Sequence, residues 1–160
     1  MSASGASLRL ARAIALIVPA ALLAGAYVSQ YGFGLFPCEM CWWQRYPHFA
    51  AIVLAALAFL LPPIRLLVWL AAIAVAVSGL IGGYHAGVEY GWWEGVTACT
   101  AQLGGGENSL DAIMNAPLVR CDVAPWSLLG ISLAGWNFLF SMAAALTIAL
   151  LLTRSGKGGS

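Results

Sequence analysis

The chain has 160 residues, of which 62% are hydrophobic and 8% are charged, and its formal net charge is +1. A soluble domain carries about 25% charged residues, so this composition excludes an ordinary soluble protein and indicates an integral membrane protein. We therefore expect membrane lipid around the chain and no nucleic-acid partner.

Charge-free stretches mark the expected membrane spans. They cover residues 13–38, 46–64, 66–88 and 123–153, and a spanning helix needs about 20 apolar residues. The sequence thus predicts an all-α membrane protein, a bundle of four transmembrane helices that forms a single domain over residues 1–160. The spans are expected at about 11–30, 41–61, 65–85 and 126–152, with outer loops at about 31–40 and 86–125.

The charges are distributed unevenly between the two ends of these spans. One set of ends carries Arg9, Arg12, Arg65, Arg154 and Lys157, and the other set carries Glu39, Glu89, Glu94, Glu107, Asp111 and Asp122. Cytoplasmic loops of membrane proteins are enriched in Lys and Arg. Both termini are therefore expected in the cytoplasm, and both loops, with all four cysteines, on the outer side, where disulfides persist.

The first span follows Arg9 and Arg12 and contains Pro19. A basic start, an apolar run and the small residues 24–26 also fit a secretory signal with a cleavage site. Because three further spans follow, an uncleaved first helix explains the pattern equally well, and we expect it to remain as one of the four helices.

The second span opens on a Cys-x-x-Cys pair, Cys38 and Cys41, with Arg45 one turn further on. Positions three, four and seven apart share a face of a helix, so these three side chains form one stripe. A helix N-terminus and a nearby cation both stabilise a thiolate, and Pro37 with Glu39 suits a helix that begins here. An arginine at this depth is costly in lipid, which indicates a functional site.

Two histidines lie near the same depth as the cysteine pair. His85 is at the outer end of the third span, level with Cys41 and Arg45, and it is either a site residue or an ordinary interfacial histidine. His48 follows Cys41 by seven residues, on the same helical stripe, but Pro47 is expected to bend the helix just before it. The sequence leaves the role of His48 open.

The second outer loop contains the other two cysteines, Cys99 and Cys121. A short helix over about 109–114 is expected in this loop, with an apolar face that rests on the membrane surface. Arg120 directly precedes Cys121 and either lowers the pKa of that thiol or is a solvated side chain.

The arrangement of the four cysteines decides between three kinds of chemistry. Structural zinc sites usually combine two closely spaced ligand pairs, and only one such pair is present, so we expect no metal. Structural disulfides are an alternative, and a redox pair that works with a second redox pair fits best. Disulfide formation releases two electrons, and the sequence has no dinucleotide-binding, P-loop or haem-attachment motif. A membrane quinone beside Cys41 is the acceptor that fits, with Arg45 polarising one of its oxygens.

These residues resemble the DsbB family of bacterial disulfide-bond-forming membrane proteins. The resemblance rests on Cys38-x-x-Cys41-x-x-x-Arg45, on His85, on the pair Cys99 and Cys121, and on Val119-Arg120-Cys121 ahead of Trp126 and Gly130. It implies a four-helix bundle in the bacterial inner (cytoplasmic) membrane with periplasmic cysteines. It also implies the reoxidation of a periplasmic thioredoxin-like dithiol oxidase (DsbA-like), with electrons passing to ubiquinone or menaquinone near His85.

The resemblance further implies a role for each cysteine. The reduced partner would attack Cys99 and form a mixed disulfide, and Cys121 would then be released to exchange with Cys38. Cys41 would be the thiolate that faces the quinone, with Arg45 beside it.

Two alternatives remain open at this point. One is a protein similar to vitamin K epoxide reductase, also a four-helix thiol enzyme linked to quinones, but in that family the loop cysteines precede the Cys-x-x-Cys pair. Here the pair comes first, at the second span. The other alternative is a non-enzymatic membrane scaffold with two structural disulfides.

Overall fold

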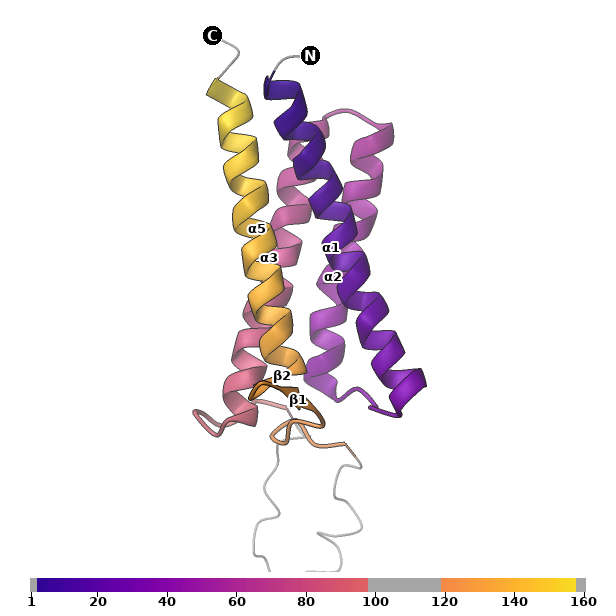
Figure 1. The fold of residues 1–160 in the computed structure, drawn as a ribbon, viewed down its shortest axis with the longest axis vertical. Coiled ribbons are helices and arrows are strands. Elements are labelled where there is room, and N and C mark those ends of the chain that lie inside the picture. The colour runs from indigo at the N-terminus through magenta and orange to yellow at the C-terminus, as the bar shows by residue number, and fades with distance from the viewer. Residues whose placement is uncertain (1–2, 98–118, 158–160) are drawn as a thin grey trace, which may run out of the picture.

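The computed structural model describes residues 3–97 and 119–157. The described residues are mostly helical, as predicted, and form α1 (Ala3–Phe33), α2 (Glu39–Leu60), α3 (Ile64–Glu89) and α5 (Leu133–Lys157), with the short strands β1 (Ser127–Leu128) and β2 (Ile131–Ser132). In Figure 1 the two ends of the chain lie at the top of the bundle, and the α1–α2 connection and the hairpin lie at the bottom. The short helix expected over about 109–114 falls outside the described residues.

Three of the helices are long and apolar enough to cross a membrane, namely Gly5–Phe33, Ile64–Glu89 and Leu133–Arg154. The chain is therefore a multi-pass membrane protein. Helix α2 has 22 residues and packs between α1 and α3, but it carries polar side chains in its first half. That α2 forms a fourth span stays a prediction.

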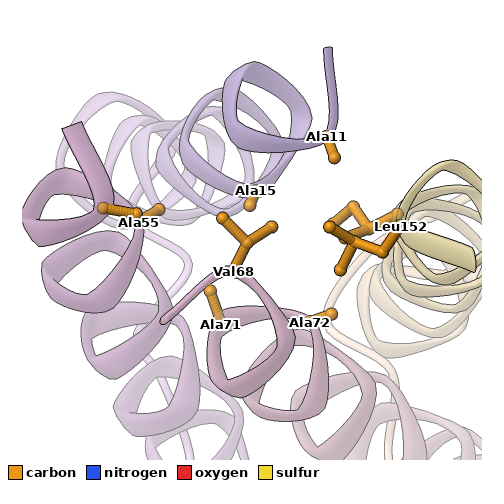
Figure 2. Close-up of a cluster of buried hydrophobic side chains, with 9 residues drawn as sticks. Ala11, Ala15, Ala55, Val68, Ala71, Ala72 and Leu152 are labelled. Carbon is orange, nitrogen blue, oxygen red and sulfur yellow. The ribbon is translucent and has the colours of Figure 1, made fainter. Parts of the chain in front are cut away.

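The helices form a ring in which α1 and α3 each pack against α2 and α5. Figure 2 shows a buried cluster at the end near the chain termini, where alanines of α1, α2 and α3 lie around Val68 of α3, and Leu152 of α5 faces them. The cluster consists of Ala11, Ala15, Ala55, Ala58, Val68, Ala71, Ala72, Ile148 and Leu152. Helix association inside a membrane depends on close van der Waals packing, which small residues permit.

Helix α3 approaches α5 closely at two of its glycines, Gly79 and Gly83. A Cβ atom built on Gly79 would lie 3.0 Å from Cβ of Ser141, and one on Gly83 would lie 2.9 Å from the ring of Phe138. Any larger residue would push the two helices apart at these positions.

Helix α5 begins at Leu133, whereas the sequence predicts a span from about Trp126. The reason is a capping hydrogen bond: the backbone N–H of Gly135 donates to Oγ of Ser132 at 3.1 Å. A serine at this position satisfies one of the free N–H groups of the first helical turn, so the helix starts immediately after it.

The residues just before α5 form an antiparallel hairpin instead of a helical turn. Its two-residue turn consists of Leu129 (φ 54°) and Gly130 (φ 77°), and such turns need positive φ at both positions. Tyr90, which follows α3, holds the hairpin because its hydroxyl accepts from Ser132 N at 2.9 Å and donates to Gly130 O at 3.3 Å. This end of the bundle carries the candidate site.

Candidate redox site

The Cys-x-x-Cys pair forms the start of α2. Cys38 is the N-cap residue, and its sulfur accepts a hydrogen bond from the backbone N–H of Cys41 at 3.3 Å. The two Sγ atoms lie 3.0 Å apart, and both cysteines are free thiols. The pair is therefore close enough to exchange a proton and to close into a disulfide with a small movement.

Cys38 is the more acidic side chain of the pair, chiefly because of its contact with the Cys41 side chain. The hydrogen bond from the Cys41 side chain lowers the pKa of the Cys38 thiol from 9.0 to about 5; burial opposes this shift, and His85 adds to it. A helix N-terminus also favours negative charge. This arrangement favours a thiolate on Cys38, whereas the resemblance assigns the thiolate to Cys41.

His85 lies between the cysteine pair and the segment that carries Cys121. Its Nε2 atom is 3.6 Å from Sγ of Cys38 and 3.1 Å from the backbone oxygen of Cys121. A carboxylate oxygen of Glu89 is 3.7 Å from the same nitrogen, and both side chains are 2% exposed. His85 therefore lies against both Cys38 and Cys121, a placement in the candidate site that the sequence alone could not separate from an interfacial one.

Cys121 packs into the same buried cluster as Cys38, together with Met40 and Val88. It is held in a disulfide whose other half lies outside the described residues. Cys99, its partner by the family resemblance, is also outside them. The described residues therefore bring together Cys38, Cys41, His85 and Cys121.

Arg45 is buried and lies against α1. Its guanidinium donates to Oε1 of Gln30 at 2.7 Å and to the backbone oxygen of Ala26 at 3.3 Å. The group also lies 4.8 Å from the ring centroid of Tyr27 and 4.9 Å from that of Trp42. The charge of Arg45 is thus satisfied by α1 and by aromatic rings.

A cavity of about 250 Å³ lies between α1, α2 and α5, next to the cysteine pair. Its wall is largely apolar, and the polar side chains in it include Cys41, Arg45, His48, His85 and Trp136. Helix α1 leaves space for the cavity because it contributes mainly small residues to the wall, such as Ala21, Gly25, Ala26 and Ser29.

The polar groups of this wall fit an aromatic ring with oxygen substituents. Nδ1 of His48 and Nε1 of Trp136 are buried and have no hydrogen-bond partner among the described residues. Buried polar atoms are nearly always paired in folded proteins. An apolar cavity with a cation, two unpaired ring nitrogens and a thiol at one edge suits a quinone head group.

A network of buried amides, which was not predicted from the sequence, joins three helices. Asn137 of α5 contacts Gln44 and His48 of α2, and also Ser78 of α3, through hydrogen bonds of 2.9 to 3.2 Å. Gln44 in turn contacts Nδ1 of His85 at 2.9 Å. The available signal was that Gln44 and Asn137 are amides within apolar stretches, where a polar side chain needs a buried partner.

The site contains three groups that can bind a metal ion, because ligand atoms of Cys38, Cys41 and His85 lie within 4.8 Å of one another. A metal-bound histidine normally donates its second ring N–H to an acceptor. Here Nε2 of Gln44, a donor that also bonds to the Met40 carbonyl, faces Nδ1 of His85. The hydrogen bonding around His85 therefore opposes metal ligation and favours thiol chemistry.

Among the described residues, the charged partner of Arg120 is Asp122 and not a cysteine sulfur. Its guanidinium pairs with Asp122, with Nε 2.8 Å from Oδ1, and the Arg120 side chain is 54% exposed. The same contact lowers the pKa of Asp122. Arg120 is thus a largely solvated residue next to Cys121.

A helical multi-pass membrane protein with a free dithiol, a buried histidine and a disulfide-bonded cysteine at one end of its bundle is a membrane thiol–disulfide protein. The chain belongs to the DsbB family, because the family described as "Disulfide bond formation protein DsbB" matches residues 8–151. This membership identifies it as a protein of disulfide bond formation.

Several relatives match along most of their length. A "Disulfide bond formation protein B" from Polaromonas sp. is 30% identical over 144 residues, which cover 86% of this chain and 86% of that protein. Proteins of the same name from Verminephrobacter eiseniae (30% identical, 92% of this chain and 88% of that protein) and Acidovorax sp. (29%, 92% and 90%) are similar. No solved structure is significantly similar to the chain.

Proposed function

We propose that this protein is a thiol:quinone oxidoreductase of the bacterial inner membrane that reoxidises a periplasmic, thioredoxin-like dithiol oxidase of the DsbA type. The observation that carries the proposal is the contact of one imidazole with both redox centres, since His85 Nε2 lies 3.6 Å from the Cys38 sulfur and 3.1 Å from the Cys121 backbone oxygen. Two disulfide-forming sites held this close can exchange electrons directly.

The proposed reaction begins at the loop cysteines. A thiolate of the reduced partner attacks Cys99, the bond between Cys99 and Cys121 breaks, and Cys121 leaves as a thiolate. The partner's second thiol then attacks the mixed disulfide, which leaves the partner oxidised and Cys99 and Cys121 reduced. The net transfer is two electrons and two protons from the partner to the loop pair.

The loop pair is reoxidised by the cysteine pair of α2. Cys121 attacks Cys38 in an oxidised Cys38–Cys41 bond, Cys41 is released, and resolution by Cys99 restores the loop disulfide. The Cys38–Cys41 pair is then a dithiol, which is the state that the structure shows, with free thiols 3.0 Å apart. The low pKa of Cys38, about 5, makes it a good leaving group.

Electrons leave the protein through the cavity beside Cys41. A quinone bound there would accept two electrons and two protons from the dithiol, which closes the Cys38–Cys41 disulfide again. Arg45, His48 and Trp136 are the wall residues that would bind its ring oxygens. The apolar remainder of the wall would hold the ring and exclude water.

The test uses purified protein in detergent with a reduced periplasmic dithiol partner and a soluble ubiquinone or menaquinone analogue. We expect quinone reduction that depends on the partner, and we expect Cys41→Ser to abolish it. Ala50→Ser, which adds a hydroxyl to the exposed face of α2, is the matched control and should retain the rate. Quinone reduction by Cys41→Ser at the rate of the unchanged protein would remove Cys41 from the proposed route.

The same protein distinguishes this proposal from a scaffold with structural disulfides. Catalytic disulfides exchange readily with a mild dithiol, whereas structural ones resist reduction. We expect both pairs to be reduced by the partner and reoxidised on addition of quinone. Cysteines that remain oxidised under these conditions would support the scaffold.

A further inference from the structure

We propose that Gln44 is a positioning residue that, together with Asn137 and Ser78, fixes the tautomer of His85 so that the ring N–H lies on Nε2 and faces Cys38 and Cys121. The proposal rests on the proposed function only where it assigns this N–H group a part in disulfide exchange. The tautomer itself follows from hydrogen bonds among buried side chains.

The orientation of the Asn137 amide follows from its contact with Ser78. One amide atom of Asn137 lies 3.2 Å from the backbone oxygen of Ser78, and a carbonyl oxygen can only accept. That atom is therefore the Nδ2 donor, which also donates to Oε1 of Gln44 at 2.9 Å. The other atom, Oδ1, accepts from Ser141 Oγ at 3.0 Å and lies 2.9 Å from Nε2 of His48.

The orientation of the Gln44 amide follows from two separate contacts. Its oxygen accepts from Asn137, so its nitrogen must lie on the opposite side. On that side the backbone oxygen of Met40, again a pure acceptor, is 3.2 Å from Nε2. The second hydrogen of Nε2 then points to Nδ1 of His85 at 2.9 Å.

His85 has only one neutral form that fits this environment. Because Gln44 donates to Nδ1, that nitrogen must carry a lone pair, and the proton of a neutral imidazole is then on Nε2. The resulting N–H faces the Cys121 carbonyl oxygen at 3.1 Å and the Cys38 sulfur at 3.6 Å, with the Glu89 carboxylate at 3.7 Å. All three are acceptors.

This N–H group holds the two exchanging segments together. With the other tautomer, a lone pair on Nε2 would face a carbonyl oxygen and a thiolate, and both contacts would be repulsive. With the proton on Nε2, the Cys121 segment is held against Cys38, and a negative charge on the Cys38 sulfur is stabilised when it leaves.

The packing around Gln44 shows that the amides are held in place. A Cβ atom built on Gly82 would lie 2.9 Å from the backbone oxygen of Ala134, 3.0 Å from Asn137 Nδ2 and 3.1 Å from Gln44 Oε1. Gln44 is 7% exposed and Ser78 is fully buried, so these hydrogen bonds are shielded from bulk water. The absence of a side chain at position 82 is what lets the amide pair form.

The first experiment reads the tautomer directly by nitrogen NMR of protein labelled with ¹⁵N in its two histidines, in detergent at alkaline pH, where imidazole is neutral. We expect the unchanged protein to carry the His85 proton on Nε2. Gln44→Glu replaces the donor by an acceptor, and we expect the proton signal to appear on Nδ1. Ser141→Ala, which removes only a second donor to Asn137, is the control and should leave His85 unchanged.

A second variant keeps the tautomer testable if Gln44→Glu does not fold. Asn137→Leu removes the group that orients Gln44 but leaves Gln44 in place, and it should give a mixture of both His85 tautomers. An Nδ1–H form in the unchanged protein, or an unaltered His85 signal in both folded variants, would overturn the proposal.

The functional readout is the turnover rate with the reduced partner. Loss of one hydrogen bond to a charged group corresponds to roughly a tenfold effect, so Gln44→Glu should lower kcat about tenfold and leave the quinone KM within about twofold. A shifted tautomer with an unchanged kcat would refute the positioning role. Lack of any turnover in the unchanged protein would instead refute the proposed function, while the NMR result would still decide the tautomer.

Discussion

The sulfur of Cys38 occupies a position that a serine or aspartate usually takes in soluble helices, because it caps the first turn of α2. The family resemblance assigns the negative charge to Cys41, with Arg45 beside it. In the structure, Arg45 is bonded to Gln30 and Ala26 of α1, and the partner of the Cys41 thiol is Cys38. The thiolate therefore depends on the helix N-terminus and on Cys41 more than on the arginine.

The acidity of Cys38 can be measured by ultraviolet absorbance of the thiolate during a pH titration of reduced protein that carries Cys99→Ser and Cys121→Ser. Because the folded pKa is about 5, the thiolate is present above this pH and is lost as the pH falls through it. Cys41→Ala removes the main stabilising hydrogen bond and should move the step upward toward 9.0. If the protein with both Cys38 and Cys41 showed a single titration step near 9.0, Cys38 would not be the acidic thiol.

The role of Arg45 is a separate prediction at the residue scale. Arg45→Ala removes a buried cation from the cavity wall and should raise the apparent quinone KM by about tenfold, the usual effect of losing a charge-assisted hydrogen bond. Arg45→Lys should recover part of this loss because the charge remains while the planar fork is lost. Steady-state kinetics check both, and a larger change in partner KM than in quinone KM would assign Arg45 to partner binding instead.

The placement of a site residue could be predicted from the sequence where it follows from spacing along one helix. The positions of Cys38 and Cys41 on one helical turn follow from the Cys-x-x-Cys pattern, and the depth of His85 follows from its span. The contact between Gln44 and Asn137 could not be predicted, because 93 residues separate them and nothing in either local sequence specifies the partner. The two amides meet across the bundle only because α3 packs against both α2 and α5.

At the scale of elements, the four long helices follow from the charge-free stretches, but the start of α5 does not. The stretch 123–153 has no charge, so its apolar pattern gives no sign of where the helix begins. The structure uses Ser132 as a cap and Tyr90 as a support for the hairpin, and Tyr90 comes from the end of another helix. A boundary that depends on a tertiary contact is not encoded in the local sequence.

Helix α1 provides the space for the cavity, and this can be tested at Gly25. A Cβ atom at Gly25 meets no atom within 4 Å, and the residue lines the cavity. Gly25→Leu should therefore fit the fold, fill part of the cavity and raise the quinone KM, whereas Gly25→Ala should have little effect.

The matched control for this change is Gly32→Leu, on the same helix but outside the cavity wall. It should leave the quinone KM unchanged. Equilibrium binding of a quinone analogue, measured by calorimetry, separates a blocked cavity from slow chemistry. Equal effects of Gly25→Leu and Gly32→Leu would show that the cavity is not the binding site.

At the scale of the whole molecule, the end of the bundle that holds both termini (Figure 1) is basic, whereas Cys38, Cys41 and Cys121 lie at the opposite end. Arg65 belongs to the basic end, where it donates to the Leu152 carbonyl near the end of α5 at 2.8 Å. If α2 crosses the membrane, the turn before α3 must lie on the side opposite to Cys38.

Single-cysteine labelling tests this topology in intact cells. In a background without native cysteines, Val123→Cys should react with a membrane-impermeant maleimide, whereas Leu61→Cys should react only after the membrane is permeabilised. Both parent residues are exposed, at 53% and 52%. Labelling of both positions from outside would show that α2 does not span the membrane and that the four-span prediction is wrong.

The N-cap position of Cys38 links the redox state of the cysteine pair to the stability of the first turn of α2. A negatively charged sulfur is a strong acceptor for the Cys41 backbone N–H, whereas a sulfur shared in a disulfide is a weak one. Each oxidation should therefore loosen the first turn of α2, and each reduction should tighten it. The Cys41 amide should therefore take up deuterium more slowly in the reduced protein than in the oxidised protein.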